Sequence, residues 1–206
     1  MSDKPQRRWY QFSLKTLLVA MLILGCLIAP ITYERQKAQR FKAAVEKLTA
    51  HGGEIGYDDS GPNQSDMVSA VLGDNRFENV TSIRFHRGSS IKDEDFRDLG
   101  QFLRLKYVRL DEIPVNDAAL LHLKDCRELK LLSPYGTRVS DAGMVHLADM
   151  KNLEELWLSK TDVSDAGVLQ LGKLAKLKSL ALHRTNITDA GVEELQKSLP
   201  NCKINY

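Results

Sequence analysis

The sequence predicts an α/β fold in which short strands and helices alternate as stacked repeats, preceded by an N-terminal transmembrane helix. Two observations carry this prediction. The apolar run between Leu17 and Ile31 stands apart in composition from the rest of the chain. From residue 80 onward, apolar residues recur every 24 positions, as in the series Leu105, Leu129, Leu153 and Leu177. A fixed period of this length is typical of solenoids, in which each unit buries its apolar side against its neighbours.

Every repeat has the same internal order. Apolar residues occupy positions one, four and six of the unit. A β-branched residue follows, and an aspartate comes two residues after it. The stretch "TDVSDAGVLQL" at 161–171 returns in this way as "TNITDAGVEEL" at 185–195. With a looser first copy that opens at Val80, the pattern predicts five repeats over residues 80–206 and a short terminal strand in "CKINY". The aspartates form the series Asp93, Asp117, Asp141, Asp165 and Asp189.

Local chemistry predicts a strand followed by a helix in each unit. In "LEELWLS" the apolar residues Leu156 and Leu158 alternate with other residues, which is the period of a strand with one buried face. Ser140, Ser164 and Thr188 are good N-cap residues, and the aspartate after each would lie at the positive end of the helix dipole. The Ala and Gly that follow are small enough to let neighbouring units approach closely.

These repeats resemble the leucine-rich repeat family, and in particular the bacterial subtype with a T-x-[IV]-[ST]-D-A-G turn. That turn is intact at 137–143, 161–167 and 185–191. The resemblance implies a right-handed β-α horseshoe with its strands on the concave side. Two features depart from the commoner pattern: Thr137, Thr161 and Thr185 replace the usual Asn or Cys, and Pro134 occupies an inward strand position. Because proline cannot donate a ladder hydrogen bond, we expect a kinked or weak strand in the third repeat.

The N-terminal segment predicts a single-pass membrane anchor that contacts the lipid bilayer through residues 12–31. This length approaches the ~20 residues that a bilayer requires, and Trp9, Tyr10 and Tyr33 flank it as interfacial aromatics. A cleaved signal peptide is less favoured because Pro follows Ala29, and acylation at Cys26 is less favoured because the chain stays apolar beyond it. The basic residues on the two sides nearly balance, so they do not decide the orientation. The resemblance implies a bacterial cytoplasmic membrane with the repeats on its outer side.

The segment between anchor and repeats is expected to cap the solenoid. Residues 34–50 predict a helix with Phe41, Ala44, Val45 and Leu48 on one face. This helix could extend the anchor, self-associate or pack against the repeats, and packing is favoured. A short strand at 54–57 and a short helix after Asp66 complete the cap. The predicted domains are therefore 1–33 (tail and anchor), 34–79 (juxtamembrane helix and cap) and 80–206 (repeats).

Nothing in the sequence indicates catalysis, a cofactor or a metal. The common hydrolase, nucleotide-binding and metalloprotease motifs are absent. His122 and His146 hold one repeat position in consecutive units, so periodicity accounts for them without a metal. Each aspartate of the repeat series is explained by its helix start rather than by a cation. The three cysteines suggest no disulfide, and Cys126 is expected to be a buried helix residue. We therefore expect a protein that is not an enzyme.

What remains is the side of the strands that points away from the core. Its three columns bring aromatic residues beside arginines, a combination that is typical of binding hot spots. Charges of both signs argue against nucleic acid, whose groove would be uniformly basic. The sequence thus predicts a non-catalytic module that binds a protein or peptide on its concave face; a self-associating envelope spacer is the alternative, and an enzyme with an unrecognised site is less favoured. The predicted contact residues are Arg84, His86, Tyr107, Arg109, Asp111, Leu131, Tyr135, Glu155, Trp157 and His183.

Overall fold

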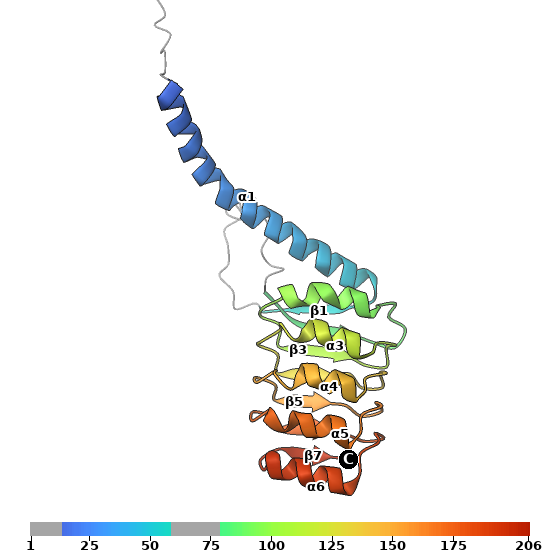
Figure 1. Ribbon diagram of the computed structural model, residues 1–206. Coiled ribbons are helices and arrows are strands. Elements are labelled where there is room, and N and C mark those ends of the chain that lie inside the picture. The colour runs from blue at the N-terminus through green and yellow to red at the C-terminus, as the bar shows by residue number, and fades with distance from the viewer. Residues whose placement is uncertain (1–13, 59–78) are drawn as a thin grey trace, which may run out of the picture.

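The computed structural model describes residues 14–58 and 79–206, which form one long helix and a stack of strand–helix units (Figure 1). The strands are β1 Glu54–Tyr57, β2 Val80–Phe85, β3 Tyr107–Leu110, β4 Leu131–Ser133, β5 Glu155–Trp157, β6 Ser179–Ala181 and β7 Lys203–Asn205. The helices are α1 Leu14–Ala50, the 3-10 helix η2 Asp93–Gln101, α3 Asp117–Leu123, α4 Asp141–Leu147, α5 Asp165–Val168, its 3-10 continuation η3 Leu169–Lys173, and α6 Asp189–Ser198.

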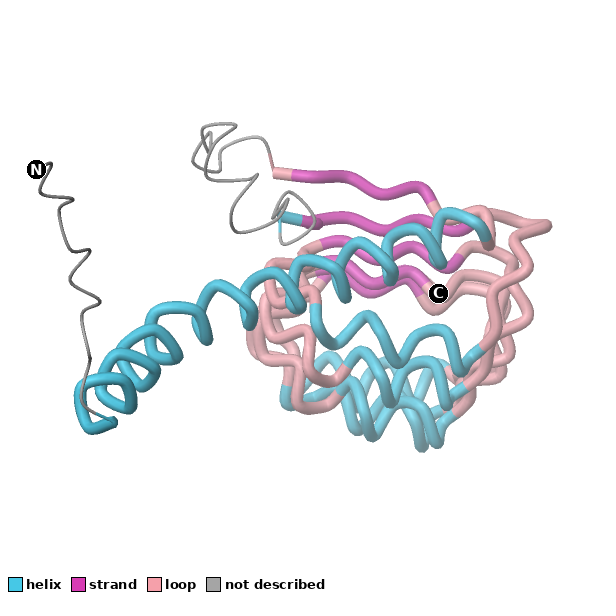
Figure 2. The backbone as a smooth tube through the Cα atoms, turned by 90° about the horizontal axis from the view of Figure 1, so that it is seen from above, coloured by secondary structure: helices cyan, strands magenta, loops and turns pink. Residues whose placement is uncertain are grey.

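A single sheet holds all seven of these strands in sequence order. β1 pairs with β2 antiparallel, and every later pair is parallel. The sheet forms one side of the stack and the helices form the other, as Figure 2 shows from above. The predicted register holds, because Tyr107 pairs with Leu131 and Glu155 pairs with Ser179. The predicted α/β solenoid, preceded by an apolar helix, is confirmed.

One continuous core runs between the sheet and the helices. Leu105, Leu129 and Leu153, which open three successive repeats, are buried as their spacing predicted. The first repeat uses larger side chains: Phe85 and Phe96 lie with their ring centroids 6.1 Å apart. Burial of one such aromatic ring is worth about 1.5 to 3 kcal/mol. A single unit on its own would expose this apolar side to water, and stacking against neighbouring units buries it.

The repeat aspartates bind the next unit, a role that the sequence analysis did not predict. Asp117 accepts two hydrogen bonds from Ser140, one from its backbone N–H at 2.8 Å and one from its hydroxyl at 2.7 Å. Asp141 does the same for Ser164, and Asp165 for Thr188. The serine or threonine is thus both the N-cap position of its own helix and the donor to the preceding repeat. The capping role alone was therefore an incomplete account.

The glycine of the D-A-G motif makes room for this carboxylate. A Cβ atom at Gly143 would overlap Oδ1 of Asp117, and one at Gly167 would overlap Oδ1 of Asp141. In the second repeat the equivalent residue is Ala119, and there the preceding Asp93 accepts one hydrogen bond, from the backbone N–H of Asn116 at 2.9 Å. The motif therefore encodes contact between repeats as well as the start of a helix.

In the last three repeats, the threonine in the turn after the strand donates a hydrogen bond within its own turn. Thr137 Oγ1 donates to the Pro134 carbonyl at 2.7 Å, and Thr161 Oγ1 donates to the Leu158 carbonyl at 2.6 Å. Strand β4 ends before Pro134 and is as long as β5 and β6, so the predicted kink is not seen within the strand. The predicted weakening is limited to the β4–β5 ladder, which has two residue pairs where β3–β4 and β5–β6 have three. The effect of the proline is local: Leu158 N–H donates to the next unit at 2.8 Å, and Pro134 has no N–H to do so.

The residue that ends each strand turn adopts a left-handed conformation in four successive repeats. Glu112, Lys160 and Arg184 have φ of 53°, 57° and 57°, and Gly136 has φ of 65°. A non-glycine residue costs about 1 kcal/mol or more in this region. Hydrogen bonds offset that cost, because the N–H of Lys160 donates to the His183 carbonyl at 2.8 Å and the N–H of Glu112 donates to the Tyr135 carbonyl at 2.7 Å.

Helix α1 joins two segments that the sequence analysis separated. It is continuous through Pro30, and Figure 1 shows it leaving the stack as one bent rod. Its second half packs on the first repeat through the predicted face of Phe41, Ala44, Val45 and Leu48. The predicted strand at 54–57 is β1, whereas the predicted helix after Asp66 lies outside the described residues. The helix therefore both extends the apolar segment and caps the repeats.

A buried carboxylate fixes this cap. Lys47 Nζ of α1 lies 2.9 Å from Asp95 Oδ1 and 3.3 Å from Asp98 Oδ2, both of η2. Burial alone would raise the pKa of Asp95, but the N–H of Lys92 and the Lys47 ammonium together hold it below its usual value. The aspartate thus stays charged while it lies against α1, and it ties the helix to the first repeat.

The first half of α1 is apolar, and none of its described side chains belongs to the core. By length and composition it could cross a membrane, and none of its most apolar window is buried against the described part of the chain. Leu22 in that window is 69% exposed. Membrane spans and signal sequences share these properties.

Candidate functional site

The side of the sheet that faces away from the helices carries the predicted contact residues, and we call it the strand face. Register places Ser82, Tyr107 and Leu131 in one column across β2, β3 and β4. Arg84 and Arg109 are Cα partners in the next column. The aligned columns fix the spacing between side chains at about 4.8 Å per strand.

Most of the predicted residues are accessible on this face. Arg84, His86, Tyr107 and His183 are exposed, and Tyr107 leaves 45% of its surface open. The residues that are half-buried are Arg109, Asp111, Tyr135, Glu155 and Trp157. Leu131 is different, because it lies in the middle of its column and is 8% exposed. Leu131 therefore belongs to the floor of the strand face and offers a partner little surface.

Two predicted residues contact each other across an intervening repeat. The guanidinium carbon of Arg109 on β3 lies 4.7 Å from the ring centroid of Trp157 on β5. Between them on β4 is Ser133, which is fully buried and donates its hydroxyl proton to Asp111 Oδ1 at 2.8 Å. The pair is a cation–π contact of the kind that orders an arginine without using its N–H donors.

A second bridge crosses the same repeat at the edge of the face. Lys160 Nζ lies 3.1 Å from Glu112 Oε1 and 4.8 Å from the ring centroid of Tyr135. The Tyr135 and Glu112 side chains raise the pKa of Lys160 above its ordinary value by favouring the ammonium form. A Cβ atom at Gly136 would lie 2.9 Å from Glu112 Cγ. The glycine therefore leaves space for the Glu112 side chain to reach Lys160. Lys160 and Glu112 were not predicted, although Glu112 directly follows the predicted Asp111.

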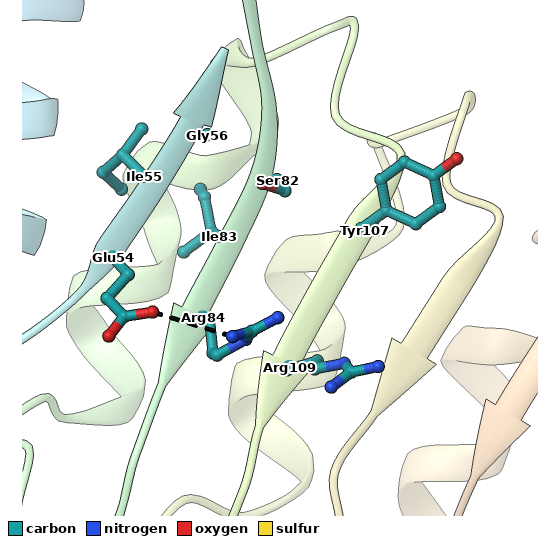
Figure 3. A pocket seen from close by; sticks show the side chains of 8 residues that line it. All are labelled: Glu54, Ile55, Gly56, Ser82, Ile83, Arg84, Tyr107 and Arg109. Atoms are coloured by element: carbon teal, nitrogen blue, oxygen red, sulfur yellow. Dashed lines mark ion pairs between the residues drawn. The ribbon is translucent and has the colours of Figure 1, made fainter.

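The N-terminal end of the strand face is hollowed into a pocket of about 260 Å³. Arg84, Tyr107 and Arg109 project from β2 and β3, and Glu54 faces them from β1 (Figure 3). Glu54 Oε2 lies 3.8 Å from Arg84 Nη1, and Glu54 Oε1 lies 3.1 Å from His86 Nε2. Glu54 also escaped prediction, because only the repeat strands were counted as part of the face. The small residues Ser82 and Gly56 also line the pocket.

The described residues hold no cluster of three His, Cys, Asp or Glu side chains suited to a metal. Cys126 is buried in the turn after α3 rather than in a helix, and burial raises its pKa to about 12. A thiol with such a pKa is a poor nucleophile at neutral pH. The chemistry available on the strand face is thus contact through aromatic rings, guanidinium groups and a few carboxylates.

Comparison with known proteins yields structural neighbours only. No protein-family profile matches the sequence, and no curated protein matches it. Solved structures that resemble it include internalin inlF of Listeria monocytogenes, at 22% identity and a TM-score of 0.44 over 53% of this chain and 30% of that one. Internalin C2 of the same organism gives 19% identity and a TM-score of 0.49 over 70% of this chain and 57% of its own.

A leucine-rich repeat protein of Leptospira interrogans gives 15% identity and a TM-score of 0.26, over 53% of this chain and 45% of that one. This chain therefore spans less than two thirds of each of the three structures. The 24-residue period, the parallel register and the buried leucines decide the assignment. The fold is a leucine-rich repeat solenoid.

The helix side of the leucine-rich repeat stack has a feature of its own. Leu121, Val145 and Leu169 occupy one repeat position on three successive units, and they are 37%, 54% and 42% exposed. They form an apolar stripe, which we call the helix stripe. An exposed apolar patch often marks a contact surface.

Proposed function

We propose that this chain is a membrane-anchored protein-binding module that is not an enzyme and that binds its partner on the concave strand face. The observation that carries the proposal is the strand face itself: Tyr107, Tyr135 and Trp157 stand beside Arg84 and Arg109 on a sheet of fixed register. Large aromatic and arginine side chains dominate binding hot spots because they bury much area with few rotatable bonds.

The anchor is the second part of the proposal. We assign residues 1–33 to the tail and anchor, 34–79 to the juxtamembrane helix and cap, and 80–206 to the repeats. The unburied apolar half of α1 supports lipid contact over residues 12–31, because a helix apolar on every side is unfavourable in water. We place the repeats on the outer side of a bacterial cytoplasmic membrane. Resistance of the full chain to extraction by alkaline carbonate tests the anchor, and release into the soluble fraction would contradict it.

Site-specific cross-linking tests the strand face. A photoreactive amino acid is introduced in place of Tyr107 or Glu155 in the full chain, and in place of Val145 to probe the competing helix stripe. Tyr107 and Val145 are exposed, and Glu155 is half-buried. Irradiation in membranes of the producing organism should give a discrete partner adduct from positions 107 and 155, and Trp157→Ala should abolish it at unchanged thermal stability. Adducts from position 145 alone would contradict the proposal.

A self-associating structural protein is the second candidate, and the helix stripe favours it. Stacking two stripes would cover Leu121, Val145 and Leu169 on each copy, which is the gain that drives apolar association. Sedimentation of the full chain in a neutral detergent separates the two candidates. A dimer that Val145→Arg converts to a monomer supports self-association, whereas a monomeric parent removes this candidate.

A further inference from the structure

The pocket at the N-terminal end of the strand face has the chemistry of a carboxylate receptor. Arg84 and Arg109 are Cα partners on adjacent parallel strands, so their side chains leave the sheet in parallel from points about 4.8 Å apart. Figure 3 shows both guanidinium groups on the same side of the sheet, below the Tyr107 ring. Both arginines line the same pocket, so an anion that enters it meets guanidinium donors from two strands.

The guanidinium N–H groups of these two arginines donate no hydrogen bond to the described part of the chain. Arg84 approaches Glu54 at 3.8 Å, which is an ion pair but too long for a hydrogen bond. Arg109 stacks on the Trp157 ring at 4.7 Å, and a stacked guanidinium keeps its in-plane N–H groups available. The pocket therefore offers oriented donors to a group that comes from outside.

The net charge of the pocket favours a ligand group with a single negative charge. Two guanidinium groups face one resident carboxylate, so one further carboxylate brings the pocket to neutrality. A phosphate dianion would carry a second negative charge toward Glu54, and like charges at this range repel. The small residues Gly56 and Ser82 leave a hollow of about 260 Å³, which is ample for the end of an Asp or Glu side chain.

From this geometry we infer that the pocket formed by Arg84, Arg109 and Tyr107 receives a side-chain carboxylate from an acidic segment of the protein partner, and that Glu54 competes with that carboxylate. The inference rests on the proposed function and names the chemistry of one end of the strand face. Glu54 already shows how a carboxylate lies there, because it contacts both Arg84 and His86. An incoming carboxylate approaches the same Arg84 guanidinium, where the negative charge of Glu54 repels it.

Binding of a defined acidic peptide tests the inference. The probe is a fluorescein-labelled penta-glutamate peptide with an amidated end, and penta-glutamine is its neutral counterpart. Fluorescence anisotropy follows their binding to the full chain in a neutral detergent. We expect penta-glutamate to bind and penta-glutamine not to bind. Arg84→Gln and Arg109→Gln should each weaken binding about tenfold, because each removes a charged hydrogen-bond donor.

Two further variants make the result independent of lost folding. Glu54→Gln should strengthen binding about threefold, since it removes the competing charge without removing a donor. Arg184→Gln, on an exposed turn at the other end of the repeats, should change binding less than about twofold. Equal binding of the two peptides, weaker binding by Glu54→Gln, or displacement of the probe by inorganic phosphate more readily than by acetate would overturn the inference.

Cross-linking from position 155 separates this inference from the proposed function. If Arg84→Gln with Arg109→Gln leaves the partner adduct intact while Trp157→Ala removes it, partner binding on the strand face holds and the carboxylate receptor is rejected. If the strand-face positions give no adduct even in the parent, the proposed function fails whatever the peptide does. Loss of the adduct in the double arginine variant, together with tighter peptide binding by Glu54→Gln, supports both.

Discussion

Replacement of Gly143 by alanine tests whether the aspartate ladder holds neighbouring repeats together. A Cβ atom at this position would overlap Asp117 Oδ1 and would lie 2.9 Å from Leu120 Cδ1. The Asp117 carboxylate must therefore move, and it then loses its two hydrogen bonds from Ser140. Losing two hydrogen bonds to a half-exposed carboxylate costs about 2 kcal/mol. Overpacking adds about 1 to 3 kcal/mol, and the better helix propensity of alanine returns about 1 kcal/mol.

The expected net loss for Gly143→Ala is therefore about 3 kcal/mol in the free energy of unfolding. Urea denaturation of the full chain in a neutral detergent, followed by circular dichroism, measures it. Gly100→Ala is the matched control, because its nearest neighbour would be Asp125 Cβ at 3.6 Å, an ordinary contact. That variant should change stability by less than about 1 kcal/mol.

A double mutant gives the sharper result. Asp117→Ala alone should cost about 2 kcal/mol, because the same two hydrogen bonds are lost. Once that carboxylate is absent, Gly143→Ala meets chiefly the flexible end of Leu120, so the double variant should also lose about 2 kcal/mol. Independent effects would instead give about 5 kcal/mol for the pair. Additive costs would refute the account in which this glycine exists to accommodate the aspartate of the preceding repeat.

Three further perturbations probe the cap, the third repeat and the buried thiols. The pKa of Asp95 in the folded state lies below its usual 3.8, so the ionised carboxylate stabilises the fold fully above pH 3.8 and loses this effect as pH falls through the lower folded value. Asp95→Asn should therefore flatten the decline of the urea midpoint below about pH 4. Pro134→Leu restores an N–H where Leu158 and Leu182 donate to the next unit, and it should raise the free energy of unfolding by about 1 kcal/mol in the same urea assay. Cys126 and Cys202 are buried and their pKa values are raised by desolvation, so iodoacetamide should alkylate them, as mass spectrometry would detect, only after denaturation.

The fold was predictable because a repeat sequence states its core many times over. The position of Val108 recurs at Leu132, Leu156 and Leu180, so an incorrect core assignment at one of them would disagree with the other three. The strand at 54–57 was also predictable from local signals. Continuity of α1 through Pro30 was not, because proline usually ends a helix in water. Proline in a helix interior removes one backbone hydrogen bond and crowds the carbonyl four residues earlier, which can bend a helix without ending it.

The candidate site was predictable in its columns and not in its contacts. Alternation fixes which residues face outward, so Arg109 and Trp157 were placed correctly on the strand face. Their contact depends on Ser133 between them, since a larger residue would keep the two apart. The double role of Asp117 was hidden for a related reason: its partner Ser140 lies 23 residues away, and each residue alone has a sufficient local explanation.

The third repeat is where the pattern departs most, and the structure gives those departures one consequence. Ser133 and Gly136 are smaller than the equivalent residues of the second and fourth repeats. Over Ser133, Arg109 meets Trp157, and over Gly136, Glu112 meets Lys160. Two non-covalent contacts thus join β3 and its turn to β5 and its turn across the third repeat: Arg109 with Trp157, and Glu112 with Lys160. A partner that contacts Trp157 must therefore also affect Arg109, which lines the pocket. Contacts at the two ends of such a surface are coupled, so their binding energies should not add.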